Sequence, residues 1–300
     1  MEIQARRRGR QTYYYLTHSY REGGKVRKIE RYLGRTIPKN LDSIKDDLRV
    51  ELFSRQWEPA LDRAQHEYFA NLREMPATIR EKELDTFSTK FTYNSNRIEG
   101  SSLTFRETAL LLGEGITPSD RPLTDVQETL AHQKVFREAL RGSPRLDLET
   151  LLKWHEELFR QTKPRLAGRI REYRVGISGS AFEPPTPIEL DSLLQEFFSW
   201  LRASWRTLHP VVLAALVHLR LVTIHPFGDG NGRVTRIAMN YVLYRKRYPM
   251  VDIPYTRRAG YYRALEQAQV MQDEGVFVRW FLRRYLEENA QRVRKPRVTS

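Results

Sequence analysis

The chain has 300 residues, of which 40% are apolar and 29% charged, a balance typical of soluble folded proteins and unlike that of disordered chains. It contains no cysteine, which excludes disulfides and thiolate chemistry, and it has no apolar run of the roughly twenty residues that a membrane span needs. The Arg-rich start lacks the apolar segment of a secretory signal, so we expect a cytoplasmic protein outside membranes. The net charge of +14 favours polyanionic partners, although basic residues also serve solubility.

Residues 1–40 differ in composition from the rest of the chain. Their net charge of +8 is more than half of the total, and tyrosines and β-branched residues flank a Glu-Gly-Gly-Lys turn at 22–25. This pattern predicts a small β-hairpin module over residues 1–41. Its basic and aromatic side chains suit nucleic acid, through phosphate contacts and base stacking, and equally a dimerisation or docking arm. The sequence leaves these alternatives open.

From residue 42 onward, apolar residues recur at three- and four-residue spacing, the period of amphipathic helices. The pattern predicts an all-α body, with a helical N-terminal region over 42–90, a larger domain over 91–290 and a basic tail over 291–300. Helices are expected at 42–56, 58–74, 76–90, 105–113, 124–141, 147–161, 189–204, 209–224, 232–247, 259–272 and 276–289.

A polar segment, HPFGDGNGRVTR at 225–236, separates two of the apolar helices. Gly230 and Gly232 permit positive φ, so successive backbone N–H groups can converge on an anion beside the positive end of the following helix. Arg233 and Arg236 lie three residues apart on one face of that helix, and guanidinium groups bind phosphate oxygens in pairs. The segment therefore predicts a phosphate-binding site.

Two further side chains of this segment bring reactive chemistry. Asp229 is the kind of ligand that Mg²⁺ takes together with substrate phosphates. His225 has an ordinary pKa near neutrality and can act as a general base. Together these residues predict a phosphate site with a base and a metal ligand beside it.

HPFGDGNGRVTR resembles the active-site motif of the Fic family, His-Pro-Phe-x-Asp/Glu-Gly-Asn-Gly-Arg-x-x-Arg, at every defining position. The resemblance covers about residues 90–285 and implies a helical bundle that transfers AMP from ATP to a Ser, Thr or Tyr hydroxyl of a target protein. It implies that His225 deprotonates the hydroxyl and that Asp229 holds Mg²⁺. The implied phosphate ligands are Asn231 with the backbone of Gly230 and Gly232 for the α- and β-phosphates, and Arg233 and Arg236 for the outer phosphates.

The string Ser95-Asn-Arg-Ile-Glu99-Gly100 resembles the Fic inhibitory motif, Ser/Thr-x-x-x-Glu-Gly/Asn. In a helix, Ser95 and Glu99 would lie one turn apart. The resemblance implies that Glu99 pairs with Arg236 and keeps the γ-phosphate away from it. One alternative is a helix end capped by Gly100 with a solvated Glu99. Another is that Glu99 orients a water that removes AMP.

Two other segments resemble Fic elements. Residues 168–180, followed by Pro184-Pro185, resemble the flap, a β-hairpin that pairs with an extended target segment; the alternative is an ordinary surface hairpin. Tyr262 resembles an adenine-side aromatic and could instead be buried, while Gln269 stands where the family often has asparagine. The flap residues expected to dock the target are Val175, Gly176, Ile177, Ser178 and Gly179.

The sequence thus predicts an autoinhibited protein adenylyltransferase that uses ATP and Mg²⁺, with removal of AMP as an open second activity. Two alternatives belong to other classes: a Doc-like protein phosphotransferase, and a nucleic-acid-binding regulator with a vestigial Fic core. The complete motif with its Ser95–Glu99 pair argues against the first, and intact His225, Asp229 and Arg236 argue against the second. A homodimer is compatible with the family, but no residue pattern decides it.

Overall fold

The computed structural model describes residues 1–22, 25–38, 40–142 and 145–293, and the chain divides into two compact units, Met1–Arg63 and Ala64–Ser300. The Gly-Gly tip of the predicted hairpin and residues 294–300 of the predicted tail lie outside the described residues. Among the described helices, none combines the length and apolar character needed to cross a bilayer.

The N-terminal unit contains a three-stranded antiparallel sheet in the order β1-β2-β3 and helix α1. Leu16 and Tyr20 of the central strand join Leu48 and Leu52 of the helix in one apolar cluster. The predicted hairpin is present as β2 and β3. A third strand, β1, was not predicted, because this Arg-rich segment lacks apolar alternation. It is an edge strand, where charged side chains are common. The bounds are β1 Glu2–Arg8, β2 Gln11–Glu22, β3 Lys25–Gly34 and α1 Leu41–Gln56.

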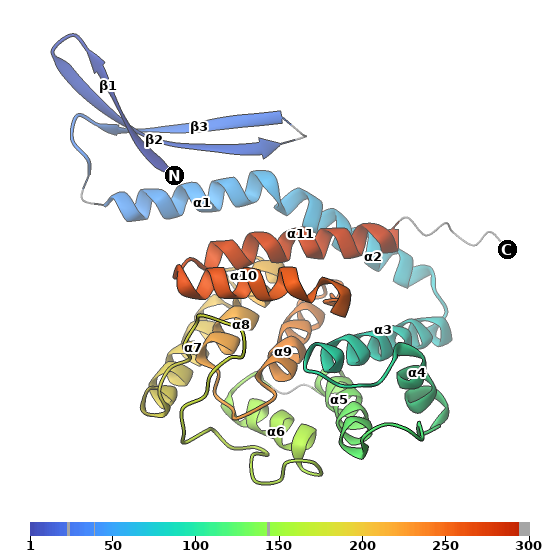
Figure 1. Cartoon of the computed structure of the whole chain (residues 1–300). Helices are drawn as coiled ribbons and strands as arrows, with labels where there is room; N and C mark the ends of the chain where they lie inside the picture. The colour runs from blue at the N-terminus through green and yellow to red at the C-terminus, as the bar shows by residue number, and fades with distance from the viewer. Residues whose placement is uncertain (23–24, 39, 143–144, 294–300) are drawn as a thin grey trace. The chain divides into compact units, whose positions relative to one another are not determined.

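The rest of the chain is helical, which confirms the predicted all-α body. Helices α8 and α9 pack against each other at its centre; α3, α5 and α6 contact α9, while α7 and α11 contact α8 (Figure 1). The bounds are α2 Glu58–Glu74, α3 Ala77–Ile98, α4 Phe105–Glu114, α5 Leu123–Arg141, α6 Leu148–Phe159, α7 Leu190–Ser204, α8 Pro210–Ile224, α9 Asn231–Arg245, α10 Arg258–Val270 and α11 Glu274–Val293, with 3₁₀ turns at Pro187–Glu189 and Tyr255–Arg257.

The polar motif connects the two central helices. Helix α8 buries most of its residues on all sides, as expected of a helix in the middle of a bundle. It ends at His225 in the left-handed conformation, with φ 51°, and α9 begins after Gly230, with φ 78°. The apolar helices therefore fix both ends of a short, sharply turned polar loop.

Helix α3 extends eight residues beyond the predicted end at residue 90, up to Ile98. The apolar periodicity did not predict this extension, because its buried residues include polar ones that are hydrogen-bonded inside the bundle. Asn94 donates to Asp252 at 2.6 Å, and Ser95 accepts from Arg236 at 3.0 Å. This extension carries the Ser95–Glu99 segment to the start of α9.

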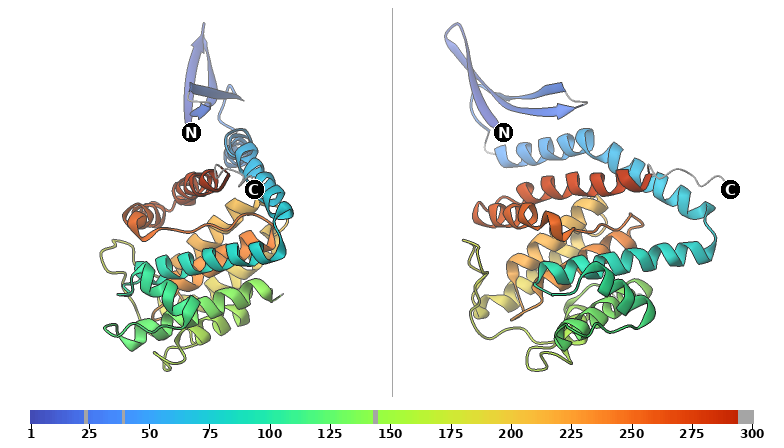
Figure 2. Two further views of the ribbon diagram at one scale, coloured as in Figure 1. Left: turned by 90° about the vertical axis from the view of Figure 1, so that its right-hand side faces the viewer. Right: turned by 45° about the vertical axis from the view of Figure 1, so that its right-hand side comes forward.

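The segment predicted as a β-hairpin flap is an irregular connection between α6 and α7 (Figure 2). No strand occurs between residues 145 and 293, so the predicted hairpin was wrong as secondary structure. One turn bond joins the Ser180 N–H to the Ile177 carbonyl at 3.1 Å. The backbone near the start of the segment is bonded to an arginine side chain instead of a partner strand.

Candidate active site

Arg236, which is buried, forms an ion pair with the partly exposed Glu99. The Arg236 side chain is 1% exposed, and its Nη2 lies 2.8 Å from Glu99 Oε1. The same guanidinium donates from Nη2 to the Ser95 carbonyl at 2.9 Å and from Nε to Ser95 Oγ at 3.0 Å. The structure therefore brings together the two motifs that lie 137 residues apart in sequence.

The Glu99 carboxylate lies at the N-terminus of α9. A Cβ placed on Gly232 would come within 2.3 Å of Glu99 Oε1, so the carboxylate rests against the first turn of the helix. Helix geometry leaves the first N–H groups of α9 without partners in the helix, and this end attracts anions. Glu99 is also the C-cap residue of α3, followed by Gly100 at φ 101°. The helix therefore ends as the alternative expected, but Glu99 pairs with Arg236 and is not simply solvated.

Two buried histidines support Arg236 through hydroxyl groups. His132 Nε2 lies 3.0 Å from Ser95 Oγ, and His218 Nε2 lies 2.9 Å from the Tyr261 hydroxyl. Burial holds the pKa of His132 well below its ordinary value and lowers that of His218 to about 3, and the Arg236 charge adds to both effects. Both rings are therefore neutral at pH 7. No sequence motif includes His132 or His218, so neither was predicted as part of the site.

His225 is oriented by its own backbone. Its Nδ1 lies 3.1 Å from the Val222 carbonyl, so Nδ1 carries the proton and Nε2 is left as the acceptor nitrogen. Burial lowers the pKa of His225, the Val222 carbonyl opposes that shift, and the Arg171 charge lowers the pKa further. The imidazole is thus in the neutral form that a general base requires.

We expect the acid limb of the kcat/KM profile to lie below pH 6.5, the ordinary pKa of histidine. A lowered pKa keeps the ring deprotonated as the pH falls, so activity should decline only at more acidic pH. The measurement is a pH series of transfer rates at subsaturating ATP. An acid limb above pH 6.5 would contradict the buried, neutral His225.

Arg171 forms hydrogen bonds both with the flap segment and with the loop that begins at His225. Its side chain donates to the carbonyls of His225 at 2.8 Å, Tyr173 at 2.9 Å and Pro185 at 2.6 Å, and its N–H donates to the Pro226 carbonyl at 2.9 Å. Arg171 is only 4% exposed. The sequence offered no signal for this residue beyond its place in the flap segment.

Replacing Arg171 with methionine should lower transfer about ten- to a hundredfold, because a small displacement of a reacting group has that effect. The loss of its charge should also raise the pKa of His225 and move the acid limb to higher pH. A general loss of stability would not move the limb. The pH profile and the thermal stability of Arg171→Met should both be measured. An acid limb at the same pH as in wild type would show that Arg171 has a purely structural role.

Asp229 and Arg233 are both ion-paired in this structure. Arg233 Nη2 lies 3.1 Å from Asp229 Oδ1 and also pairs with Glu128, while Lys163 Nζ lies 2.7 Å from Asp229 Oδ2. Burial would raise the pKa of Asp229, but Arg233 and Lys163 outweigh it and hold this pKa below its usual value. Glu128 and Lys163 belong to no recognisable motif, so the sequence did not predict them as site residues.

The Asp229 carboxylate has the donor chemistry of a magnesium ligand. Among the described residues, no three His, Cys, Asp or Glu side chains gather into a protein-only metal site. Mg²⁺ commonly binds one or two carboxylates plus substrate phosphates. Asp229 is ionised beside the start of α9, and its role as a Mg²⁺ ligand stays a prediction.

Asn231 holds the shape of the loop. Its amide accepts from the Phe227 N–H at 2.9 Å and donates to the Phe227 carbonyl at 2.8 Å. His155 Nε2 lies 3.0 Å from the Asp229 carbonyl. With its amide engaged in this way, Asn231 can reach a phosphate through its backbone N–H, and that contact stays a prediction.

Gly230 leaves no room for a side chain, since a Cβ there would come within 2.3 Å of the Phe159 ring. Gly230→Ala should lower the free energy of unfolding by about 2–4 kcal/mol, from positive φ and overpacking. Gly113→Ala is the control: Gly113 is in α4, where a Cβ meets nothing within 4 Å, and should change stability by at most about 1 kcal/mol. Denaturant unfolding of both variants checks this, and equal stabilities would contradict it.

A cavity of about 210 Å³ adjoins this cluster. It is smaller than pockets that enclose whole drug-sized ligands, which measure roughly 300–1,000 Å³. Its charged lining suits the polar part of a ligand. The lining residues are Asn96, Glu99, Gly100, Ser101, Thr124, Asp125, Glu128, Lys163, Asp229 and Arg233.

Tyr262 lies at the edge of the same region. It is 46% exposed, so the buried-aromatic alternative does not describe it, and its hydroxyl donates to the Ile98 carbonyl at 2.9 Å. Its neighbour Tyr261 is the buried ring. Gln269 lies about two helix turns after Tyr262 on α10. Its side chain donates to Thr223 Oγ1 at 3.1 Å. An adenine contact at Tyr262 stays a prediction.

Comparison with known proteins agrees with this geometry. Residues 145–243 match the model of the Fic/DOC family. The protein adenylyltransferase Fic of Drosophila willistoni is 34% identical over 180 residues, 59% of this chain and 36% of that protein. The Drosophila erecta protein of the same name is 33% identical over 201 residues, 66% of this chain and 40% of that protein. This chain therefore spans less than half the length of these relatives.

Solved structures show the same fold. A Fic domain containing signaling protein from Bacteroides thetaiotaomicron has a TM-score of 0.70 and 26% identity, covering 78% of this chain and 95% of that one. Fic-1 from C. elegans has a TM-score of 0.70 and 24% identity over 85% of this chain and 75% of that one, and supports the fold alone. Residues 145–243 therefore match the Fic/DOC family, and the chain shares the fold of solved Fic proteins.

Proposed function

We propose that this chain is a protein adenylyltransferase that transfers AMP from ATP to a hydroxyl of a target protein. The observation that carries the proposal is the Glu99 carboxylate paired with Arg236 at the start of α9, where a phosphate group would bind. Relatives at 33–35% identity carry the name protein adenylyltransferase. The neutral His225, with Nε2 as acceptor, supplies the base.

In the proposed reaction, His225 Nε2 accepts the proton of the target hydroxyl. The oxygen then forms a bond to the α-phosphorus, and the bond from that phosphorus to the bridging oxygen of pyrophosphate breaks. Mg²⁺ held by Asp229 would neutralise charge on the phosphates. Arg233, Arg236 and the N–H groups at the start of α9 would hold the phosphate oxygens in line.

Inhibition follows from competition for one guanidinium. Arg236 cannot offer Nη2 to an outer phosphate while that nitrogen is bound to Glu99 and the Ser95 carbonyl. ATP would then bind in a pose unsuited to in-line attack. Removal of AMP by a water that Glu99 orients is the second activity that this position would allow.

A target would dock on the flap segment, at Val175, Gly176, Ile177, Ser178 and Gly179. The part of the segment around Gly176 is exposed and has no regular structure, so an extended target strand could pair with its backbone. Such pairing would place the hydroxyl beside His225, to which Arg171 connects the segment.

The experiment that tests the proposed reaction compares ATP labelled at the α- or the γ-phosphate. Incubation of the chain with Mg²⁺, labelled ATP and protein extract should label protein from the α-position only. Label from the γ-position only would instead establish the Doc-like phosphotransferase. No protein label from either, with Glu99 also replaced, would refute group transfer from ATP.

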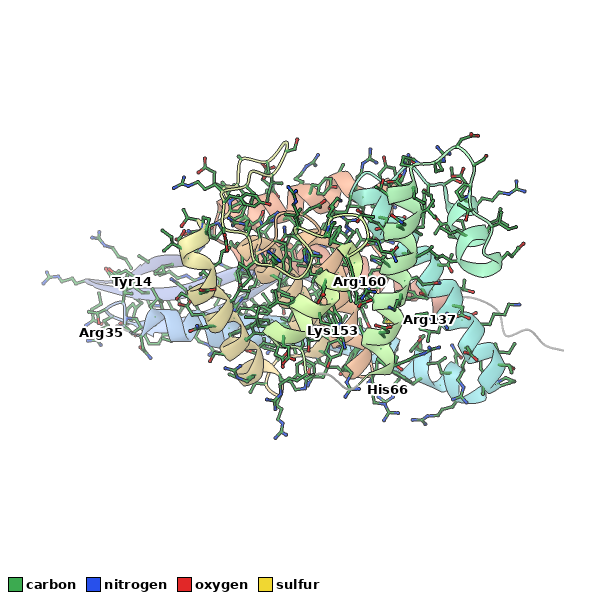
Figure 3. All side chains as sticks on the ribbon, turned by 90° about the horizontal axis from the view of Figure 1, so that it is seen from below. Tyr14, Arg35, His66, Arg137, Lys153 and Arg160 are labelled. Atoms are coloured by element: carbon green, nitrogen blue, oxygen red, sulfur yellow. The ribbon has the colours of Figure 1, made fainter. Side chains whose placement is uncertain are left out.

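A specific observation favours nucleic acid as partner of the N-terminal sheet. Tyr13 and Tyr15 lie on the face opposite the Leu16 cluster; the Tyr15 and Tyr32 ring centroids are 5.3 Å apart, and Arg6 lies 4.6 Å over Tyr15. Arg35, at the end of this sheet (Figure 3), lies 6.0 Å over the Tyr13 ring. Aromatic rings with flanking arginines support base stacking and phosphate contacts.

Fluorescence anisotropy with labelled single- and double-stranded DNA at two salt concentrations tests this partner. The double variant Arg6→Ala/Arg35→Ala should weaken binding and reduce its salt dependence. The control with the same charge is Arg137→Ala/Arg160→Ala, outside the sheet (Figure 3). Equal binding by both variants would contradict the proposal and favour a docking arm. A homodimer stays a prediction.

A further inference from the structure

Four charged side chains beside the proposed nucleotide site form a closed ring. Lys163 Nζ lies 2.7 Å from Asp229 Oδ2 and 2.9 Å from Glu128 Oε1. Arg233 Nη2 lies 3.1 Å from Asp229 Oδ1, and its Nη1 pairs with Glu128 Oε2. Each carboxylate thus contacts the lysine with one oxygen and the arginine with the other.

The ring is electrically neutral and partly removed from water. The Arg233 and Glu128 side chains are nearly buried, and Lys163 and Asp229 border the cavity. The Phe159 ring lies under both cations, 5.0 Å from Lys163 Nζ and 4.5 Å from the Arg233 guanidinium carbon. Partly buried charges without partners would be unfavourable, so the ring satisfies charges that a ligand would otherwise satisfy.

Each added member of the ring has the chemistry of the ligand it would exclude. The lysine ammonium is a compact cation bound to the carboxylate that is proposed to hold Mg²⁺. The Glu128 carboxylate is an anion bound to a guanidinium proposed to hold an outer phosphate. The Glu99 carboxylate stands in the same relation to Arg236.

We propose that Lys163 and Glu128 form a second internal lock on this site, with Lys163 in place of the divalent cation on Asp229 and Glu128 in place of an outer phosphate on Arg233. The inference rests on the proposed function, since it takes the Mg²⁺–nucleotide complex as the ligand. It differs from the Glu99 contact because it acts on other residues, and replacing Glu99 leaves the ring intact. Nucleotide binding must therefore open the ring even when Glu99 is absent.

The Lys163 half is tested with Mn²⁺ alone, by electron paramagnetic resonance of the free ion with the full chain and no nucleotide. Lys163→Met should bind Mn²⁺ about tenfold or more tightly than wild type, because it exposes two adjacent carboxylates. The control is Lys134→Met, since Lys134 also contacts two carboxylates, those of Glu138 and Glu157. Equal Mn²⁺ affinity of the Lys163 variant and wild type would overturn this half. Lys163→Gln serves if the methionine variant does not fold.

The Glu128 half is tested by ATP affinity in the Glu99→Gly background. Adding Glu128→Gln should tighten ATP binding about three- to tenfold, because Arg233 loses a competing anion. Unchanged or weaker binding in the folded double variant would overturn this half. If neither variant binds ATP, the proposed function fails, and the Mn²⁺ result still decides whether Lys163 occupies a cation site.

Discussion

Glu99→Gly is expected to raise adenylyl transfer by roughly ten- to a hundredfold over wild type. The substitution removes the anion that lies 2.8 Å from Arg236 Nη2, and it clears the carboxylate from the first turn of α9. An outer phosphate can then bind the guanidinium, which aligns the α-phosphate for attack. The measurement is the initial rate of labelling from α-labelled ATP.

Glu99→Gln separates charge from shape in that experiment. The amide keeps the size of the side chain and one acceptor oxygen but no charge, so its rate should fall between wild type and Glu99→Gly. Glycine at this C-cap position should leave the fold intact, because the position ends α3 and is followed by a glycine. Equal rates for wild type and Glu99→Gly would reject the inhibitory role.

His225→Ala in the Glu99→Gly background should lower transfer by about 10²–10⁴-fold, the usual contribution of a general base. ATP affinity should hardly change, because the base is proposed to act on the target hydroxyl and not to bind phosphate. His66→Ala in the same background is the matched control, since His66 is an exposed histidine on α2 (Figure 3).

The two measurements together make that prediction specific. A fall in rate with retained ATP affinity indicates lost chemistry. A parallel loss of ATP affinity would instead place His225 among the binding residues. A rate equal to that of the His66 variant would remove His225 from the mechanism.

The sequence predicted the helical body well because apolar periodicity is a local property. Helix α8 is almost wholly apolar, and α9 follows two glycines, Gly228 and Gly230, so the limits of both can be recognised without knowledge of the fold. Strand β1 could not be recognised in that way. Its pairing with β2 depends on backbone hydrogen bonds, which the side chains of an Arg-rich segment do not predict.

The candidate site was predictable only where residues are close in sequence. His225, Asp229 and Arg236 lie within twelve residues, and their chemistry is apparent from type and spacing. Glu128 and Lys163 come from separate segments that folding brings to Arg233 and Asp229. No period or motif connects them, because the contacts depend on how α5, α6 and α9 pack.

The flap shows a different limit. The resemblance to the Fic flap predicted a hairpin, but Arg171 donates to three carbonyls and no strand ladder forms in the segment. A side chain that replaces backbone pairing cannot be recognised from alternation.

The intact mass of the purified chain after incubation with Mg²⁺ and ATP tests the central claim most directly. It should be measured for wild type, Glu99→Gly and Glu99→Gly/His225→Ala. A parallel incubation includes protein extract as the source of targets, and the modified protein is identified by mass. An adenylyl-sized gain on protein with the single variant, absent with the double variant, is the predicted result. A phosphoryl-sized gain, or an equal gain with the double variant, would contradict the account.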